Sequence, residues 1–156
     1  MLRIRTYFSY SIVMLVYQVI IMVLLNPRAT TIMSYPSSFF VITLIVLLPL
    51  IALIEEGMFR YVPYKLFSRL SGSRNFGIFM IIVFFVVGGI FHLSNLSELS
   101  DILEVGKYFF IQGSNSSIFG YVFMKEGIVG SYLVHVFYDI FLLAVLLMAV
   151  QGIRRY

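Results

Sequence analysis

Long apolar runs constrain this chain more than any other feature. Four of them approach the ~20 residues that a membrane-crossing helix needs: Tyr7–Leu25, Phe39–Ile54, Phe76–Leu93 and Ile128–Val150. The chain is 61% hydrophobic and 12% charged, whereas a soluble domain is usually about half apolar. We therefore expect an all-α polytopic membrane protein. Its 156 residues form a single membrane domain, 1–156.

A fifth segment, Tyr108–Met124, is apolar but interrupted by amide and hydroxyl side chains. It can cross a membrane only if those groups face protein or water. Lys125-Glu126-Gly127 predicts a tight turn between it and the last run. We expect a transmembrane helical bundle of about five membrane helices.

Several breaks are predicted between the runs. The segment Asn26–Ser38 contains two prolines and is expected to be a loop, and Leu96–Gly106 is expected to be a loop or a short surface helix. The second run has no break at its charged end, so its helix should continue through Arg60 and bend near Pro63. Gly88-Gly89 would let another backbone approach closely.

Basic residues favour a cytoplasmic N-terminus. Lys and Arg gather in Met1–Arg5 and in Lys65–Arg74, while Glu98–Glu104 is acidic. Five crossings would then place Arg154 and Arg155 on the outer side, against the positive-inside rule. Either Tyr108–Met124 does not cross completely, or the tail violates the rule.

Ionisable residues within the apolar runs are few and come from three predicted helices. They are Glu55, Glu56, Arg60, His92, His135 and Asp139. Ionisable groups at membrane depth are costly and indicate a functional site. The spacing of Glu56 and Arg60 places them on one helix face, so they can pair. The side chain of Glu55 points about 100° away from that of Glu56, which leaves it free to face the bundle centre.

The last two residues of this set have the same spacing. His135 and Asp139 stand four positions apart, so Asp139 could set the tautomer of His135 or bind substrate directly. Taken singly, each residue could instead be a helix-packing hydrogen bonder.

Three kinds of chemistry fit this residue set. A glutamate can activate water while histidines stabilise an oxyanion. Glu55, His92 and His135 can bind a divalent metal such as zinc. The groups can also relay protons in a small carrier, although they cluster rather than form a continuous stripe. The chain has no cysteine and no nucleic-acid-binding signature.

The order Glu-Glu-x-x-x-Arg, His, His-x-x-x-Asp resembles the CPBP family of intramembrane proteases, which includes CAAX proteases and bacteriocin-processing (Abi) proteins. Residues 55–60, His92 and 135–139 match its first, second and fourth motifs, and the likeness covers about residues 44–147. Phe110–Gly113 and Gly120–Gly127 resemble its glycine-rich third region. Gly88 stands where the second motif usually has Phe, and the chain is short for the family.

The resemblance implies an intramembrane endopeptidase in the cell membrane. By it, Glu55 is the general base for water and His92 orients that water or shuttles a proton. His135 and Asp139 stabilise the oxyanion or orient the substrate, and Glu56 and Arg60 support them. The family is often called a metalloprotease family, but the same residues also fit a metal-free mechanism, so the cofactor is either a metal or none.

The expected partners are a peptide or membrane-protein substrate and the lipid bilayer, and the oligomeric state stays open. Exported peptides or bacteriocin leaders are favoured over prenylated CAAX proteins because the chain is short. The alternative is a non-catalytic membrane scaffold or bacteriocin-immunity protein of the same fold.

The helix positions also raise a question of depth. Glu55 is late in its run and His135 is early in its own, so antiparallel helices would bring them to one side of the membrane. His92 is late in the intervening run, which would place it near the other side.

Overall fold

The computed structural model describes residues 4–25, 38–93 and 101–153. Within these ranges the chain is helical and contains no strand. The elements are α1 (Ile4–Leu25), α2 (Ser38–Glu56), the π-helix η1 (Gly57–Tyr61), α3 (Val62–Phe67), the 3-10 helix η2 (Ser68–Leu70), α4 (Phe76–Leu93) and α5 (Ile102–Ile153). Each apolar run predicted to be a helix lies within one of these elements, so the all-α prediction is confirmed.

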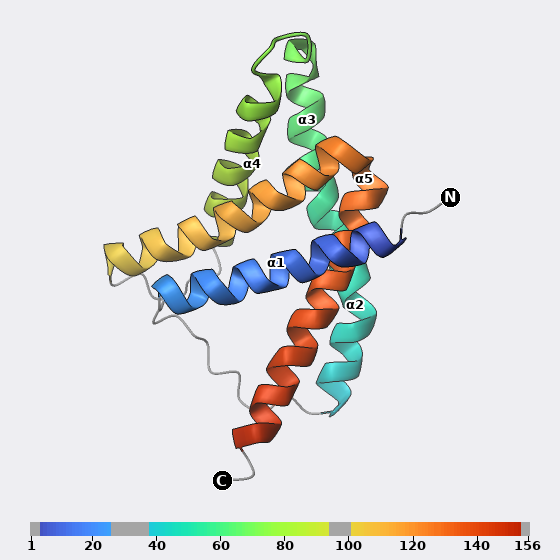
Figure 1. Ribbon diagram of the computed structural model, residues 1–156, viewed down its shortest axis with the longest axis vertical. Coiled ribbons are helices and arrows are strands. Elements are labelled where there is room, and N and C mark those ends of the chain that lie inside the picture. Colours follow the sequence, from blue (N-terminus) through green and yellow to red (C-terminus); the bar gives the residue numbers. More distant parts are fainter. Residues whose placement is uncertain (1–3, 26–37, 94–100, 154–156) are drawn as a thin grey trace.

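α5 is one element broken in the middle. Gly127 has φ 75° and ψ −176°, a backbone conformation that is not helical. This combination is essentially restricted to glycine, and it allows the chain to change direction sharply, as Figure 1 shows. We call residues 102–126 the first half of α5 and residues 128–153 the second half. The turn predicted at Lys125-Glu126-Gly127 is confirmed.

The two halves of α5 organise the fold. In Figure 1 the first half lies beside α1 and crosses α4, and the second half runs beside α2. α3 and α4 form a hairpin whose turn includes Ser71-Gly72-Ser73. α5 therefore contacts every long helix of the described part of the chain.

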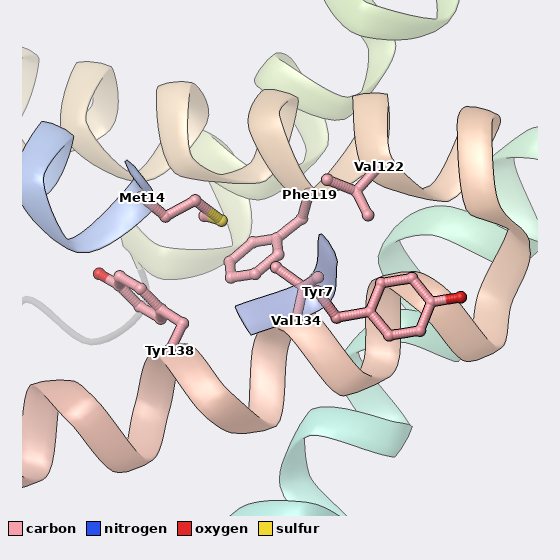
Figure 2. Close-up of a cluster of buried hydrophobic side chains, with 6 residues drawn as sticks. All are labelled: Tyr7, Met14, Phe119, Val122, Val134 and Tyr138. Atoms are coloured by element: carbon pink, nitrogen blue, oxygen red, sulfur yellow. The ribbon is translucent and has the colours of Figure 1, made fainter. Parts of the chain in front are cut away.

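A buried cluster joins α1 to both halves of α5 (Figure 2). Its members are Tyr7 and Met14 from α1, Phe119 and Val122 from the first half, and Val134 and Tyr138 from the second half. The hydroxyl of Ser11 adds a hydrogen bond of 2.9 Å to the carbonyl of Val134. Lipid tails are as apolar as these side chains, so close packing and such hydrogen bonds stabilise the assembly more than apolar burial does.

α4 and the first half of α5 approach closely at small residues. A Cβ at Gly88 would collide with Ser116, and one at Gly113 would lie 2.8 Å from the carbonyl oxygen of Phe85. The close approach predicted for Gly88-Gly89 is therefore confirmed. Ser117, on the first half of α5, donates to the carbonyl of Ile81 at 3.2 Å.

The count of about five membrane helices is not confirmed. Among the described residues, three helical stretches are long and apolar enough to cross a membrane: Ile4–Leu25, Phe76–Leu93 and Ile102–Val145. The last stretch joins both halves of α5 across Gly127, where the sequence suggested two separate helices. The loop predicted at Asn26–Ser38 lies almost entirely outside the described residues. Of Leu96–Gly106, only the part from Asp101 is described, and it enters α5 at Ile102.

Candidate active site

The helix that carries Glu55 and Glu56 does not stop at these carboxylates. α2 passes directly into the π-helix η1, where the amide of Val62 donates to the carbonyl of Gly57. Pro63 follows, and its ring has no N–H and would clash with a carbonyl in a regular α-helix. The wider π turn accommodates it, and such turns are frequent at functional sites. The predicted continuation through Arg60 is confirmed.

This continuation resolves the question of depth. Glu55 lies 16 residues before Ser71 in the hairpin turn, and His92 lies 16 residues after Phe76 at the start of α4. At about 1.5 Å per residue, both lie roughly 24 Å from the turn along antiparallel helices. Ring contacts agree, with Phe67 against Phe79 near the turn and Phe59 against Phe91 at the far end.

Glu56 is fully buried and has three partners. Its Oε1 lies 3.4 Å from Nη1 of Arg60 and 2.9 Å from Nδ1 of His135. Its Oε2 accepts a hydrogen bond of 2.5 Å from the hydroxyl of Ser131. The predicted pairing of Glu56 with Arg60 is confirmed. A buried carboxylate is tolerated when it is paired and hydrogen-bonded in this way.

His135 is oriented by Glu56. An ionised carboxylate can only accept, so Nδ1 of His135 donates to Glu56. The Nε2 atom is then left on the other edge of the ring, 3.5 Å from Oε2 of Glu55 and 3.7 Å from Oδ2 of Asp139. The spacing of four residues allows Asp139 to set the tautomer of His135. In the structure Glu56 occupies the Nδ1 side, and Asp139 lies on the Nε2 side.

Phe119 holds the ring of His135 from one face. The two ring centroids are 4.3 Å apart with planes tilted by 30°. The guanidinium carbon of Arg60 lies 5.1 Å from the centroid of the same phenyl ring. The first half of α5 thus contributes an aromatic ring that contacts both the imidazole and the guanidinium.

A cavity of about 290 Å³ brings the predicted catalytic residues together. Glu55, His92, His135 and Asp139 all line it, and so does Arg60. They come from α2, η1, α4 and the second half of α5. Glu56 does not line the cavity and instead supports His135 and Arg60 from behind.

Other polar residues of the cavity had not been singled out as site residues. Gln18 lies in an apolar run that shows no motif. Ser131 does not line the cavity, but it contacts Glu56 and precedes His135 by one helical turn. Asn115 and Ser116 belong to a segment recognised only as needing polar surroundings. Their spacing with Gln112 and Phe119, at three and four residues, could have identified them as one helix face.

Gly88 has a structural explanation. Ser116 of α5 occupies the space where a side chain at residue 88 would lie. A phenyl group there would push the two helices apart. The glycine therefore allows α4 to pack closely against Ser116, which lines the cavity.

The residues do not form a metal site as they stand. In the described part of the chain, no three His, Asp or Glu side chains are arranged so that they could hold one metal ion. Of the candidates Glu55, His92 and His135, the last presents only Nε2 to the cavity, because its Nδ1 atom is hydrogen-bonded to Glu56.

The comparisons with known proteins identify a family. Residues 36–141, which is more than half of the chain, match the model of the type II CAAX prenyl endopeptidase Rce1-like family. No curated protein and no solved structure gives a significant match.

Proposed function

We propose, since the chain belongs to the type II CAAX prenyl endopeptidase Rce1-like family, that it is an intramembrane endopeptidase that uses Glu55 to activate water. The observation that carries the proposal is the single cavity lined by Glu55, His92, His135 and Asp139. The family is a protease family whose description names CAAX prenyl substrates.

Glu55 is suited to act as the base. Its side chain is 22% exposed and borders the cavity, so water can reach it. In the proposed step its carboxylate takes a proton from water while the water oxygen attacks the scissile carbonyl carbon. As the C–N bond breaks, the same carboxyl gives that proton to the leaving amine. The products are a carboxyl and an amine terminus, and Glu55 returns to its starting form.

The two histidines position the reactants. A water that contacts Glu55 can also contact the Nε2 atom of His135, which is 3.5 Å from the carboxylate. Asp139 borders the same atom and orients the substrate. His92, which lines the cavity from α4, orients the attacking water. Hydrogen-bond donors directed at the developing oxyanion stabilise the transition state.

The substrate we propose is a peptide segment held at the membrane, from an exported or membrane-anchored protein. We further propose that the chain crosses the cell membrane several times, with α2 and the two halves of α5 as separate membrane segments beside α1 and α4. This gives five crossings if Gly127 lies at a membrane surface.

The test is cleavage by the reconstituted protein. The probes are a farnesylated peptide ending in a CAAX sequence and an unprenylated hydrophobic peptide. Glu55→Gln and His92→Ala should each lower kcat by about 10²–10⁴-fold, the usual range for acid–base groups. Glu126→Gln makes the same chemical change on α5 at the Gly127 break, where the side chain does not line the cavity, and should leave cleavage unchanged.

The opposite result would identify a different function. If both variants reach normal membrane levels and keep the activity or phenotype of the parent protein, the protease proposal is wrong. A non-catalytic scaffold or immunity protein would behave in that way. Gly88, which stands where the second motif of the family usually has Phe, packs against Ser116.

A further inference from the structure

One helix face forms a polar wall of the cavity without belonging to the Glu–His cluster. Gln112, Asn115, Ser116 and Phe119, all on the first half of α5, line the cavity together. Asn115 and Ser116 are almost fully buried, with 7% and 3% exposure. A polar face this deep needs partners for its hydrogen-bonding groups.

Gln18 of α1 holds the amide of Asn115 in place. The Nδ2 atom of Asn115 donates to Oε1 of Gln18 at 2.7 Å. The other end of the amide, Oδ1, is a buried acceptor without a protein partner, and the hydroxyl of Ser116 also has none. Leaving such groups unpaired in a protein interior is unfavourable. Both residues border the cavity, so its contents are the available partner.

We propose that Asn115 and Ser116 form a subsite that hydrogen-bonds the main chain of the peptide substrate, with Gln18 as its positioning residue; this inference rests on the proposed function. Asn115 Oδ1 accepts from a backbone N–H, and the hydroxyl of Ser116 donates to a backbone carbonyl.

The chemistry favours a peptide main chain over other occupants. An extended peptide exposes an N–H and a C=O at each residue, and in apolar surroundings each of these needs a partner. Asn115 and Ser116 offer an adjacent acceptor and donor that match this pair. Such contacts do not depend on the substrate side chains, so the subsite would hold the backbone in register with Glu55 whatever residues are cleaved.

The experiment measures peptide binding to a protein that already carries Glu55→Gln, so that nothing is cleaved. The probe is a fluorescently labelled farnesylated peptide ending in a CAAX sequence, together with analogues in which an ester oxygen replaces one backbone N–H at a time. We expect one analogue to bind roughly tenfold more weakly than the parent peptide, which is the effect of one lost hydrogen bond.

The variant Asn115→Ala should bind the parent peptide roughly tenfold more weakly. It should also bind the parent peptide and that ester analogue with the same affinity. Ser116→Ala should weaken binding without changing the response to the ester. Ser117→Ala is the matched control, because its hydroxyl donates to Ile81 and not into the cavity. Gln18→Leu should raise KM in the cleaving protein and leave kcat within a few-fold of its parent value.

The two proposals fail in different ways. If the parent protein cleaves nothing but Asn115→Ala abolishes the ester effect on binding, the protease proposal is wrong and the subsite stands. The subsite proposal is wrong if Asn115→Ala binds every peptide as tightly as its parent protein does. It is also wrong if each ester analogue weakens binding to Asn115→Ala as much as it weakens binding to the parent protein. Thermal unfolding of each variant in detergent shows whether weaker peptide binding reflects a less stable fold. An Asn115→Ala variant that is destabilised but keeps the ester effect also contradicts the subsite proposal.

Discussion

At the scale of single residues, Glu55 and Glu56 are adjacent and have opposite environments. Glu56 is fully buried and contacts Arg60, Ser131 and His135. Glu55 is partly exposed and borders the cavity. Adjacent positions on a helix point in directions about 100° apart, so one carboxylate can be buried against Arg60 and His135 while its neighbour faces the cavity.

This difference predicts that the two glutamates respond differently to the same substitution. Glu56→Gln removes the charge opposite the buried guanidinium of Arg60, and breaking a buried pair in this way typically costs about 3–5 kcal/mol. Glu55→Gln should leave stability close to that of the parent protein. Thermal or denaturant unfolding in detergent checks both, and equal stability of the two variants would contradict the assignment.

At the scale of elements, the break of α5 decides where His135 lies. The first half of α5 supplies Phe119 and the second half supplies His135, and the two rings stack only because the chain turns back at Gly127. The buried cluster of Figure 2 then holds both halves against α1. The turn therefore determines how His135 lies relative to Phe119.

Gly127→Ala tests this role. A Cβ is strained at φ 75° and ψ −176°, with a cost of about 1–3 kcal/mol. We expect lower stability and reduced cleavage together. Gly106→Ala is the control, since Gly106 lies in the same helix with open space around it. There alanine should stabilise the helix by up to about 1 kcal/mol. A parent-like Gly127→Ala protein would show that the break is not required.

At the scale of the whole molecule, α4 links the hairpin turn to the region of Asp101. Its 18 residues span about 27 Å, close to the thickness of a bilayer core. If α4 crosses the membrane, Ser71 and Asp101 lie on opposite sides. Lys65, Arg69 and Arg74 near the turn favour the cytoplasm for that side.

Cysteine labelling tests this orientation without background, since the chain has no cysteine of its own. In intact cells, a membrane-impermeant maleimide should label Asp101→Cys and not Ser71→Cys. Permeabilised cells should show labelling of both. Labelling of Ser71→Cys alone in intact cells would reverse the orientation, and equal labelling of both would show that α4 does not cross.

Local features of the site could be predicted from the sequence. Apolar runs require helices in a membrane, because the backbone has no water to bind. The i, i+4 spacing of Glu56 and Arg60 predicts their pairing from helix geometry alone. The turn at Gly127 and the close packing of Gly88 follow in the same way from local chemistry.

Tertiary structure alone decided which of these residues meet. The depth of Glu55 relative to His92 depends on how far each residue lies from the hairpin turn and on the antiparallel packing of the two helices that meet there. Glu56 and His135 are 79 positions apart, and Gln18 and Asn115 are 97 apart. Helical periodicity determines which face a residue occupies, but the partner on that face depends on how the helices cross. That crossing is set by contacts between segments distant in the chain, such as the meeting of Gly88 with Ser116.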